Sequence, residues 1–178
     1  MARGLVCLAM ALAAACGPSS PQQPKPPDTG TTTAQLPVYT GAGSPIPGLP
    51  VATARIDPAG GVLASADGSV TVTFPTGAVA QPTDFSIQAV TSLALGAVGH
   101  AYRIQPGGRT LSAPVRLTFQ GPATYAAGTS LDGLGIVYQD EKGWWHALEN
   151  VTRDPGSNTL SVDSDHFSDW GVTWQAGV

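Results

Sequence analysis

Apolar and polar side chains alternate with a period of two through much of residues 55–178. The clearest examples are residues 70–74 (Val-Thr-Val-Thr-Phe), 115–119 (Val-Arg-Leu-Thr-Phe) and 160–163 (Leu-Ser-Val-Asp). Successive side chains of a β-strand point to opposite faces, so each segment has one apolar and one polar face. No stretch keeps a helical period long enough for a sizeable helix. The pattern therefore predicts half-buried strands.

Turn sequences separate these segments at short intervals. They are Asp67-Gly68, Pro75-Thr76-Gly77, Pro106-Gly107-Gly108, residues 140–143 and Asp154-Pro155-Gly156. Glycine and proline favour the backbone angles of tight turns. Many short strands joined by such turns are typical of two packed antiparallel sheets. We therefore expect residues 55–178 to form an all-β, antiparallel β-sandwich.

The first fifteen residues have the pattern of an export signal. One positive charge, Arg3, precedes an apolar run that ends in small residues before Cys16. Such a run is too short to span a bilayer and is typical of a cleaved signal peptide. The Ala-Ala-Ala-Cys ending resembles the bacterial lipoprotein signal, in which the cysteine is acylated and becomes the new N-terminus. Leu12 lies four rather than three positions before the cysteine, so ordinary cleavage after Ala15 is the alternative.

Cysteine usage agrees with acylation. The only other cysteine, Cys7, lies in the segment that cleavage would remove, so the mature chain has no partner for a disulfide. We expect acylated Cys16 to hold the protein in a lipid bilayer. The expected localisation is that of an exported bacterial lipoprotein, at the outer membrane or cell surface rather than the inner membrane.

Residues 16–54 are expected to form a disordered, Pro-rich linker. They hold more than half of the chain's 16 prolines and only two charged residues, Lys25 and Asp28. This composition favours an extended chain without a core. It either spaces the domain from the membrane or is passive, and residues 36–50 are apolar enough to lie against the domain as an irregular strand. The expected regions are a signal peptide (1–15), a lipidated cysteine with linker (16–54) and a sandwich domain (55–178).

Five segments of the chain resemble the ZU-five domain of ankyrins, netrin receptors and zonula occludens proteins, and the resemblance extends over residues 59–174. The segments are Gly60–Leu63, Asp67–Val79, Thr83–Ile87, Tyr102–Gly108 and Leu111–Phe119. The resemblance implies a β-sandwich. It also implies a role in binding: animal ZU-five domains bind protein partners such as spectrin, and bacterial relatives resemble adhesion or scaffold modules.

His166-Phe167-Ser168 is one candidate for chemistry. It resembles the self-cleavage site of the related domain in death-domain proteins, where the bond between Phe and Ser breaks. Residues two apart in a strand share a face, so we expect the side chains of His166 and Ser168 to approach one another. The favoured interpretation is a structural His166–Ser168 hydrogen bond, with Trp170, Val172 and Trp174 continuing one face into the core. In the alternative, His166 acts as the base for Ser168 in an attack on the Phe167 carbonyl.

Trp144 and Trp145 follow a charged turn, and alternation places one of the two indoles on the outside. An exposed indole anchors a protein or glycan partner in one interpretation, and covers a neighbouring strand or the linker in the other. Residues 163–165 with Asp169 offer carboxylates for calcium but lack the spacing of a known loop, so a solvated turn is expected instead. His100 and His146 have no partner at metal-ligand spacing.

Net charge and the lack of catalytic motifs argue against several classes of function. The formal net charge is −4 at pH 7, which opposes binding of a phosphate backbone, so we expect no nucleic-acid partner. No Gly-x-Ser-x-Gly elbow or metal-binding histidine pair supports a hydrolase, and no cofactor is expected. The leading hypothesis is a membrane-tethered, non-catalytic interaction or structural module of the bacterial cell envelope. The alternative is a self-cleaving domain.

Overall fold

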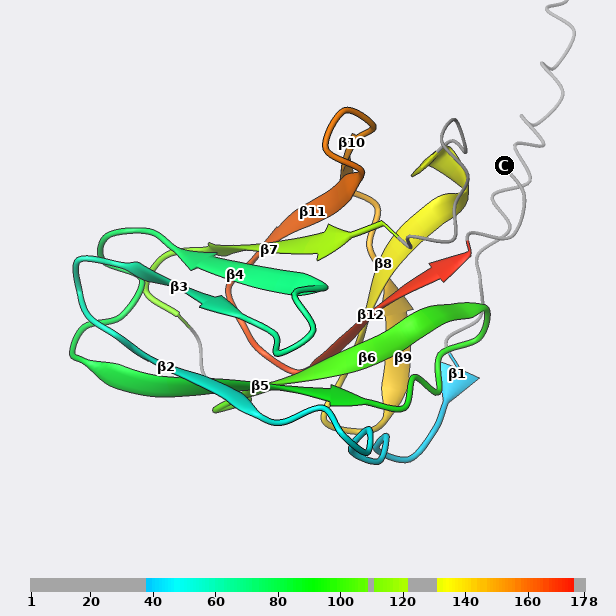
Figure 1. Cartoon of the computed structure of the whole chain (residues 1–178), viewed down its shortest axis with the longest axis horizontal. Helices are drawn as coiled ribbons and strands as arrows, with labels where there is room; N and C mark the ends of the chain where they lie inside the picture. The colour runs from blue at the N-terminus through cyan, green and yellow to red at the C-terminus, as the bar shows by residue number, and fades with distance from the viewer. Residues whose placement is uncertain (1–37, 109–110, 122–130, 175–178) are drawn as a thin grey trace, which may run out of the picture. The chain divides into compact units, whose positions relative to one another are not determined.

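The computed structural model describes residues 38–108, 111–121 and 131–174, which form two packed antiparallel sheets (Figure 1). The strands are β1 (Val38–Tyr39), β2 (Ala52–Ile56), β3 (Gly61–Ala64), β4 (Val70–Phe74), β5 (Thr83–Val90), β6 (Ala97–Gln105), β7 (Val115–Gln120), β8 (Leu134–Gln139), β9 (Trp144–Ala147), β10 (Thr152–Asp154), β11 (Thr159–Ser164) and β12 (Asp169–Trp174). A single 3₁₀ turn, Leu131–Gly133, is the helical element of the described part.

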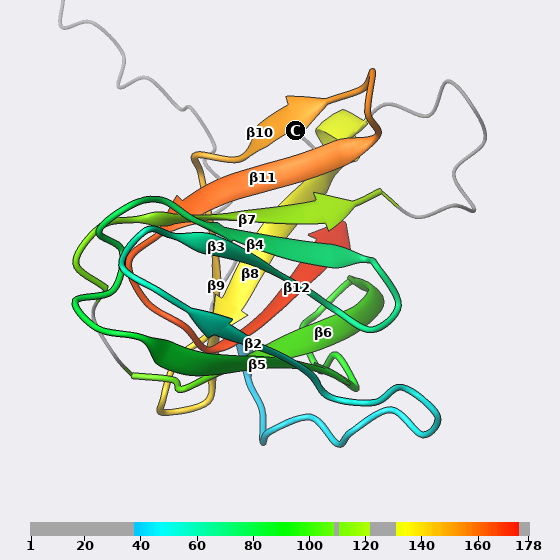
Figure 2. The ribbon, with the colours of Figure 1, turned by 60° about the vertical axis from the view of Figure 1, so that its left-hand side comes forward.

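The two sheets differ in width. One has seven strands in the order β1-β9-β8-β12-β6-β5-β2, and the other has five in the order β10-β11-β7-β4-β3. Figure 1 and Figure 2 show them as two layers. The predicted all-β, antiparallel sandwich is therefore confirmed. Within the described residues, no helix has the length and apolar character needed to cross a membrane.

The period-two segments form strands as predicted. Val70 and Val72 of β4 and Leu117 of β7 are completely buried, and Val72 pairs directly with Leu117. The polar residues between them face outward, because the outer side of the five-stranded sheet meets solvent. The alternation predicted from the sequence therefore defines the inner face of the five-stranded sheet.

Aromatic rings fill the space between the sheets. Phe74 of β4, Phe85 of β5 and Phe167 contact one another with centroid distances of 4.8–5.8 Å. Trp170 is fully buried beside them and Val172 nearly so, as predicted for this face of β12. The same prediction is wrong for Trp174, whose side chain is 48% exposed because it lies at the end of β12, beyond the covering sheet.

Residues 40–46 form a strap that joins the two edges of the seven-stranded sheet. β1 pairs with β9 at one edge, and β2 pairs with β5 at the other. Between them the strap follows the outer face, and it then continues along the edge of β5 through a bridge from Pro45 to Val90 and a hydrogen bond from the Ile46 N–H to the Ala89 carbonyl. Val90, Val137 and Trp145, which point outward, are buried in this region.

The expected domain boundary at residue 55 is therefore too late. Residues 38–54 supply β1, the strap and most of β2, and their backbone groups bond to the sheet. The interpretation of residues 36–50 as an irregular strand against the domain fits their described part, because strap residues lie on the sheet without long regular pairing.

Candidate binding surface

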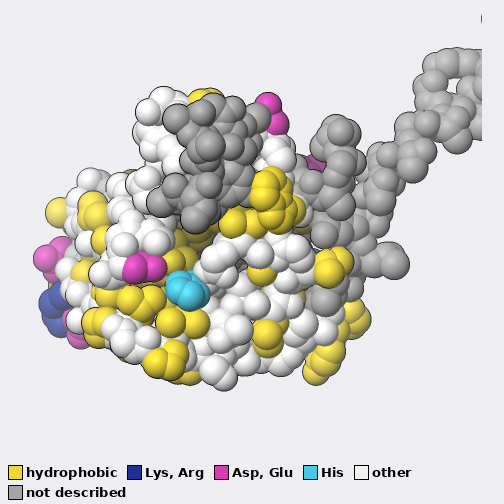
Figure 3. Space-filling view, turned by 45° about the vertical axis from the view of Figure 1, so that its right-hand side comes forward, with side chains coloured by type: hydrophobic (Ala, Val, Ile, Leu, Met, Phe, Trp, Pro, Cys, Tyr) yellow, Lys and Arg dark blue, Asp and Glu magenta, His cyan; other side chains and the backbone are white. Residues whose placement is uncertain are grey.

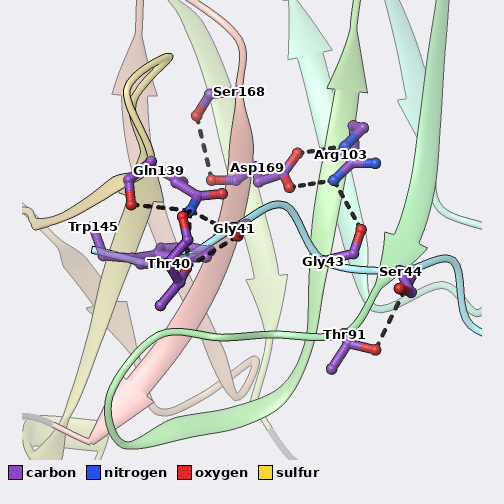
Figure 4. A network of polar contacts seen from close by, with 11 residues as sticks. Thr40, Gly41, Gly43, Ser44, Thr91, Arg103, Gln139, Trp145, Ser168 and Asp169 are labelled. Atoms are coloured by element: carbon purple, nitrogen blue, oxygen red, sulfur yellow. Dashed lines mark hydrogen bonds and ion pairs between the residues drawn. The ribbon is translucent and has the colours of Figure 1, made fainter. Parts of the chain in front are cut away.

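Trp144 and Trp145 point to opposite faces of β9, as alternation requires. Trp145 is only 5% exposed on the outer face, and its indole Nε1 donates a hydrogen bond of 2.8 Å to Thr40 Oγ1 of the strap (Figure 4). Trp144, on the other face, remains 39% exposed. Trp145 thus covers the linker-derived strap, whereas Trp144 is the indole available to a partner.

Trp144 is half of an exposed aromatic pair. Tyr39 of β1 lies directly opposite it in the strand register, and the two rings meet edge to face at 5.3 Å between centroids. Tyr39 is 64% exposed. Aromatic residues that are exposed side by side form an apolar patch, and Tyr and Trp are enriched at binding interfaces. Tyr39 was missed by sequence analysis because it lies in a segment rich in Gly, Pro and Thr.

The row of rings continues along the same face. His146 lies two residues after Trp144 in β9, and its ring stacks on Tyr138 of β8 at 5.0 Å between centroids. Tyr138 in turn meets the ring of His166 at 4.9 Å. We call these five residues the aromatic shelf: Tyr39, Trp144, His146, Tyr138 and His166. The shelf remains partly open because the seven-stranded sheet is wider than the sheet that covers it.

Each histidine of the shelf is paired with a carboxylate. His146 Nε2 lies 3.0 Å from Asp140 Oδ2, and His166 Nδ1 lies 3.2 Å from Asp165 Oδ1. The hydrogen bond from His146, followed by the backbone N–H groups of Trp144 and Lys142, lowers the pKa of the Asp140 carboxyl. The shelf therefore combines ring faces with carboxylates held at its margin.

A turn holds one of these carboxylates in place. Asp140 Oδ1 accepts hydrogen bonds from the N–H groups of Lys142 and Trp144, and Gly143 closes the turn with a φ of 92°. Only glycine fits here, because a Cβ would lie 2.5 Å from the Thr40 carbonyl oxygen. The same close approach lets the Thr40 N–H bond to the Gly143 carbonyl at 2.9 Å, which fixes β1 beside the turn.

His166, Phe167 and Ser168 lie in the connection from β11 to β12 rather than in a strand. The expected His166–Ser168 hydrogen bond is wrong: His166 Nδ1 faces Ser164 Oγ at 3.4 Å and Asp165, while Ser168 Oγ donates to the Asp169 carbonyl at 3.3 Å. The Phe167 side chain is 2% exposed and belongs to the core. The rule that residues two apart share a face does not hold where the chain crosses from one sheet to the other.

Asp163 and Asp169, on either side of this connection, are each paired with an arginine. Asp163 pairs with Arg116 at 2.8 Å on the five-stranded sheet, and Asp169 pairs with Arg103 at 2.7 Å on the seven-stranded sheet. Hydrogen bonding to Arg116 lowers the pKa of the Asp163 carboxyl. Within the described part of the chain, no group of three or more His, Cys, Asp or Glu side chains is placed to hold a metal ion.

A cavity of about 250 Å³ lies between the β3–β4 turn, the first half of β6 and the end of β7, and His100 lines it. Figure 3 shows one face of the molecule, on which a histidine side chain lies among apolar and acidic side chains. Asp67, also in the lining, accepts hydrogen bonds from Ser65 at 2.6 Å and from the Tyr102 hydroxyl at 2.7 Å. Its carboxylate therefore ties the β3–β4 turn to β6, which is a structural role.

Comparison with family models finds no match to this chain, and comparison with curated proteins finds none either. The ZU-five resemblance therefore rests on the sequence segments quoted above and stays a prediction. Cys16, the predicted lipidation site, lies outside the described residues.

Proposed function

We propose that this protein is a non-catalytic binding module of the bacterial cell envelope, tethered to the outer membrane or cell surface through acylated Cys16. The observation that carries the binding role is the exposed Tyr39–Trp144 pair. Rings of this size gain free energy when a partner covers them, because that removes their apolar area from water. The sandwich holds both rings on paired strands, so the surface is ready before the partner arrives.

The N-terminal sequence supports the tether. The apolar run before Ala-Ala-Ala-Cys fits a lipoprotein signal, and a cysteine carrying more than one acyl chain anchors a protein stably at about 0.8 kcal/mol per buried methylene. The Pro-rich stretch that follows fits a spacer between lipid and domain. The ZU-five resemblance agrees with an interaction role but leaves the partner open.

The partners of the candidate nucleophile support a non-catalytic role. The Ser168 hydroxyl bonds to a backbone carbonyl, and the imidazole of His166 is engaged by Ser164 and Asp165. A serine acts as a nucleophile when a base accepts its proton across a hydrogen bond. Ser168 has a different partner, so self-cleavage of the Phe167–Ser168 bond is the less favoured function.

Replacement of the lipidated cysteine tests the tether. Cys16→Ser should move the protein from the membrane fraction to the soluble fraction, or leave it unprocessed, because serine has no thiol to acylate. Cys7→Ser is the matched control: it lies in the segment to be removed and should leave the protein on the membrane. Wild-type protein with an unmodified Cys16 would contradict the proposal.

A further inference from the structure

We infer that the aromatic shelf binds a neutral glycan strand. This inference rests on the proposed binding function and names its ligand class. The shelf is a row of rings on neighbouring strands: Tyr39 meets Trp144, and Tyr138 lies between His146 and His166. Trp144 and His146 are two residues apart in β9, or about 6.8 Å along the strand. Tyr138 itself is partly buried between His146 and the core residue Trp170, so Tyr39, Trp144 and His146 form the accessible part of the row. An extended row of rings, rather than a single pocket, suits a chain ligand.

Exposed aromatic ring faces are complementary to the apolar side of a sugar ring. An aromatic face carries partial negative charge and attracts the weakly positive C–H groups of the apolar side of a sugar ring. Trp144 and Tyr39 are the most exposed members of the platform, at 39% and 64%. They are therefore placed to carry most of the stacking, as buried aromatic anchors do at other interfaces.

Carboxylates at the margin of the shelf are complementary to the hydroxyl groups of a sugar. Asp140 and Asp165 lie at opposite ends of the segment His146–Tyr138–His166, and both carboxylates are accessible to solvent. Carboxylates accept hydrogen bonds from hydroxyl groups, and these charge-assisted bonds are stronger than neutral ones. Rings between two carboxylates therefore supply both the stacking and the hydrogen bonds that a polyhydroxylated ligand needs.

The same carboxylates argue against two other ligand classes. Anionic polymers are repelled, because Asp140 and Asp165 place negative charge beside the shelf and the whole chain carries a net charge of −4. Protein partners usually bury aromatic rings in patches from which aspartate is depleted, because an unpaired carboxylate is costly to desolvate. A hydrated neutral glycan is not repelled by these carboxylates and does not leave them desolvated without a hydrogen-bond partner.

The platform is held rigidly before binding. β1 is fixed by its register with β9 and by the bond from Thr40 to Gly143, while Gln139 Nε2 donates to the Thr40 and Gly143 carbonyls at 3.0 and 3.1 Å. Few side chains or loops need ordering when a ligand binds, so little of the interaction energy is lost to entropy.

Native affinity electrophoresis of the full-length protein in non-ionic detergent tests this inference. The gels contain hydroxyethylcellulose or glycol chitin as neutral glycans, and alginate as an anionic one. We expect at least one neutral polymer to retard the wild type and alginate to have no effect. Trp144→Ala should weaken retardation about tenfold or more, and Trp144→Phe should restore part of it. Val62→Ala, an exposed apolar residue of β3 that is 59% exposed, is the matched control and should bind normally.

Three outcomes would overturn the glycan inference: no neutral polymer retards the wild type, alginate retards it instead, or Trp144→Ala binds as the wild type does. Thermal unfolding of each variant shows whether a loss of binding reflects a loss of fold. Failure of the proposed function is seen separately, in membrane fractionation. If membrane attachment depends on Cys16 but no neutral glycan binds, the proposal of a tethered module is retained and the glycan inference is rejected.

Discussion

At the scale of single residues, the Arg103–Asp169 pair secures the strap to the sheet. Arg103 donates through Nε and Nη2 to both carboxylate oxygens, at 2.8 and 2.7 Å, and Nη2 also donates to the Gly43 carbonyl at 3.0 Å (Figure 4). The hydrogen bonds that Arg103 donates to Asp169 raise the pKa of the Arg103 guanidinium. Both side chains are largely shielded from water, so removing one partner leaves a shielded charge unpaired.

The Arg103–Asp169 and Arg116–Asp163 pairs should therefore differ in their effect on stability. Asp169→Ala is expected to lower the free energy of unfolding by about 3–5 kcal/mol, as for other shielded pairs. Asp163→Ala breaks a bidentate pair of similar length whose side chains are about half exposed, and should cost less than about 1 kcal/mol. Urea unfolding measures both variants. Equal losses would contradict the structural role of Asp169.

Asp67 makes part of the stability pH-dependent. Burial raises the pKa of its carboxyl, but hydrogen bonds from Ser65, Tyr102 and Ser69 together lower it below the ordinary value of 3.8. A carboxyl whose pKa falls on folding stabilises the protein above its unfolded pKa, and this contribution is lost as pH falls through the folded pKa. Between neutral pH and pH 2, wild type should therefore lose more stability than Asp67→Asn. Parallel pH profiles of the two proteins, measured by thermal unfolding, would count against this account.

At the scale of elements, the sequence predicted strands best where local pattern is sufficient. β4 and β7 carry β-branched residues with strict alternation, so their period alone identifies them. β1 has two residues, and the strap is held by side chains such as Gln139 and Arg103 that lie far away in the chain. Contacts between residues so far apart in the chain produce no periodic pattern in the local sequence.

Sequence predicted only part of the candidate site, because several of its contacts also join residues that lie far apart in the chain. The Trp144–Trp145 pair was identified, because alternation in a strand exposes one of two neighbouring indoles, but the pattern left open which one. Tyr39 and Tyr138 were missed, since each is an isolated aromatic residue whose neighbours in the shelf come from other strands. The His166–Ser168 contact was mispredicted because the chain crosses between sheets at this point.

The strap and β1 should contribute strongly to folding. A protein lacking residues 1–37 keeps every described element and should unfold cooperatively with nearly unchanged Tm. Removal of residues 1–54 also deletes β1, the strap and most of β2, and uncovers Trp145 and Val90. That protein should have a much lower Tm or no cooperative transition, and its tryptophan emission should shift to the red. Equal Tm values for the two truncations would contradict the role assigned to the strap.

At the scale of the whole molecule, the two sheets of unequal width explain where a partner can bind. The five-stranded sheet packs against the seven-stranded sheet from β2 and β5 at one side to β8 at the other, and the Trp144 side chain of β9, beyond β8, remains 39% exposed. The predicted N-terminal lipid and Pro-rich segment add a tether to this binding face. A tethered module needs an intact chain that carries both the anchor and the last strand.

Intact-mass measurement of the protein purified from membranes tests this account most directly. The mass should correspond to a chain that begins at an acylated Cys16 and continues without a break through Val178. An unmodified Cys16 would remove the tether from the proposal. A C-terminal fragment beginning at Ser168, lost in Ser168→Ala, would instead establish self-cleavage and contradict the non-catalytic role.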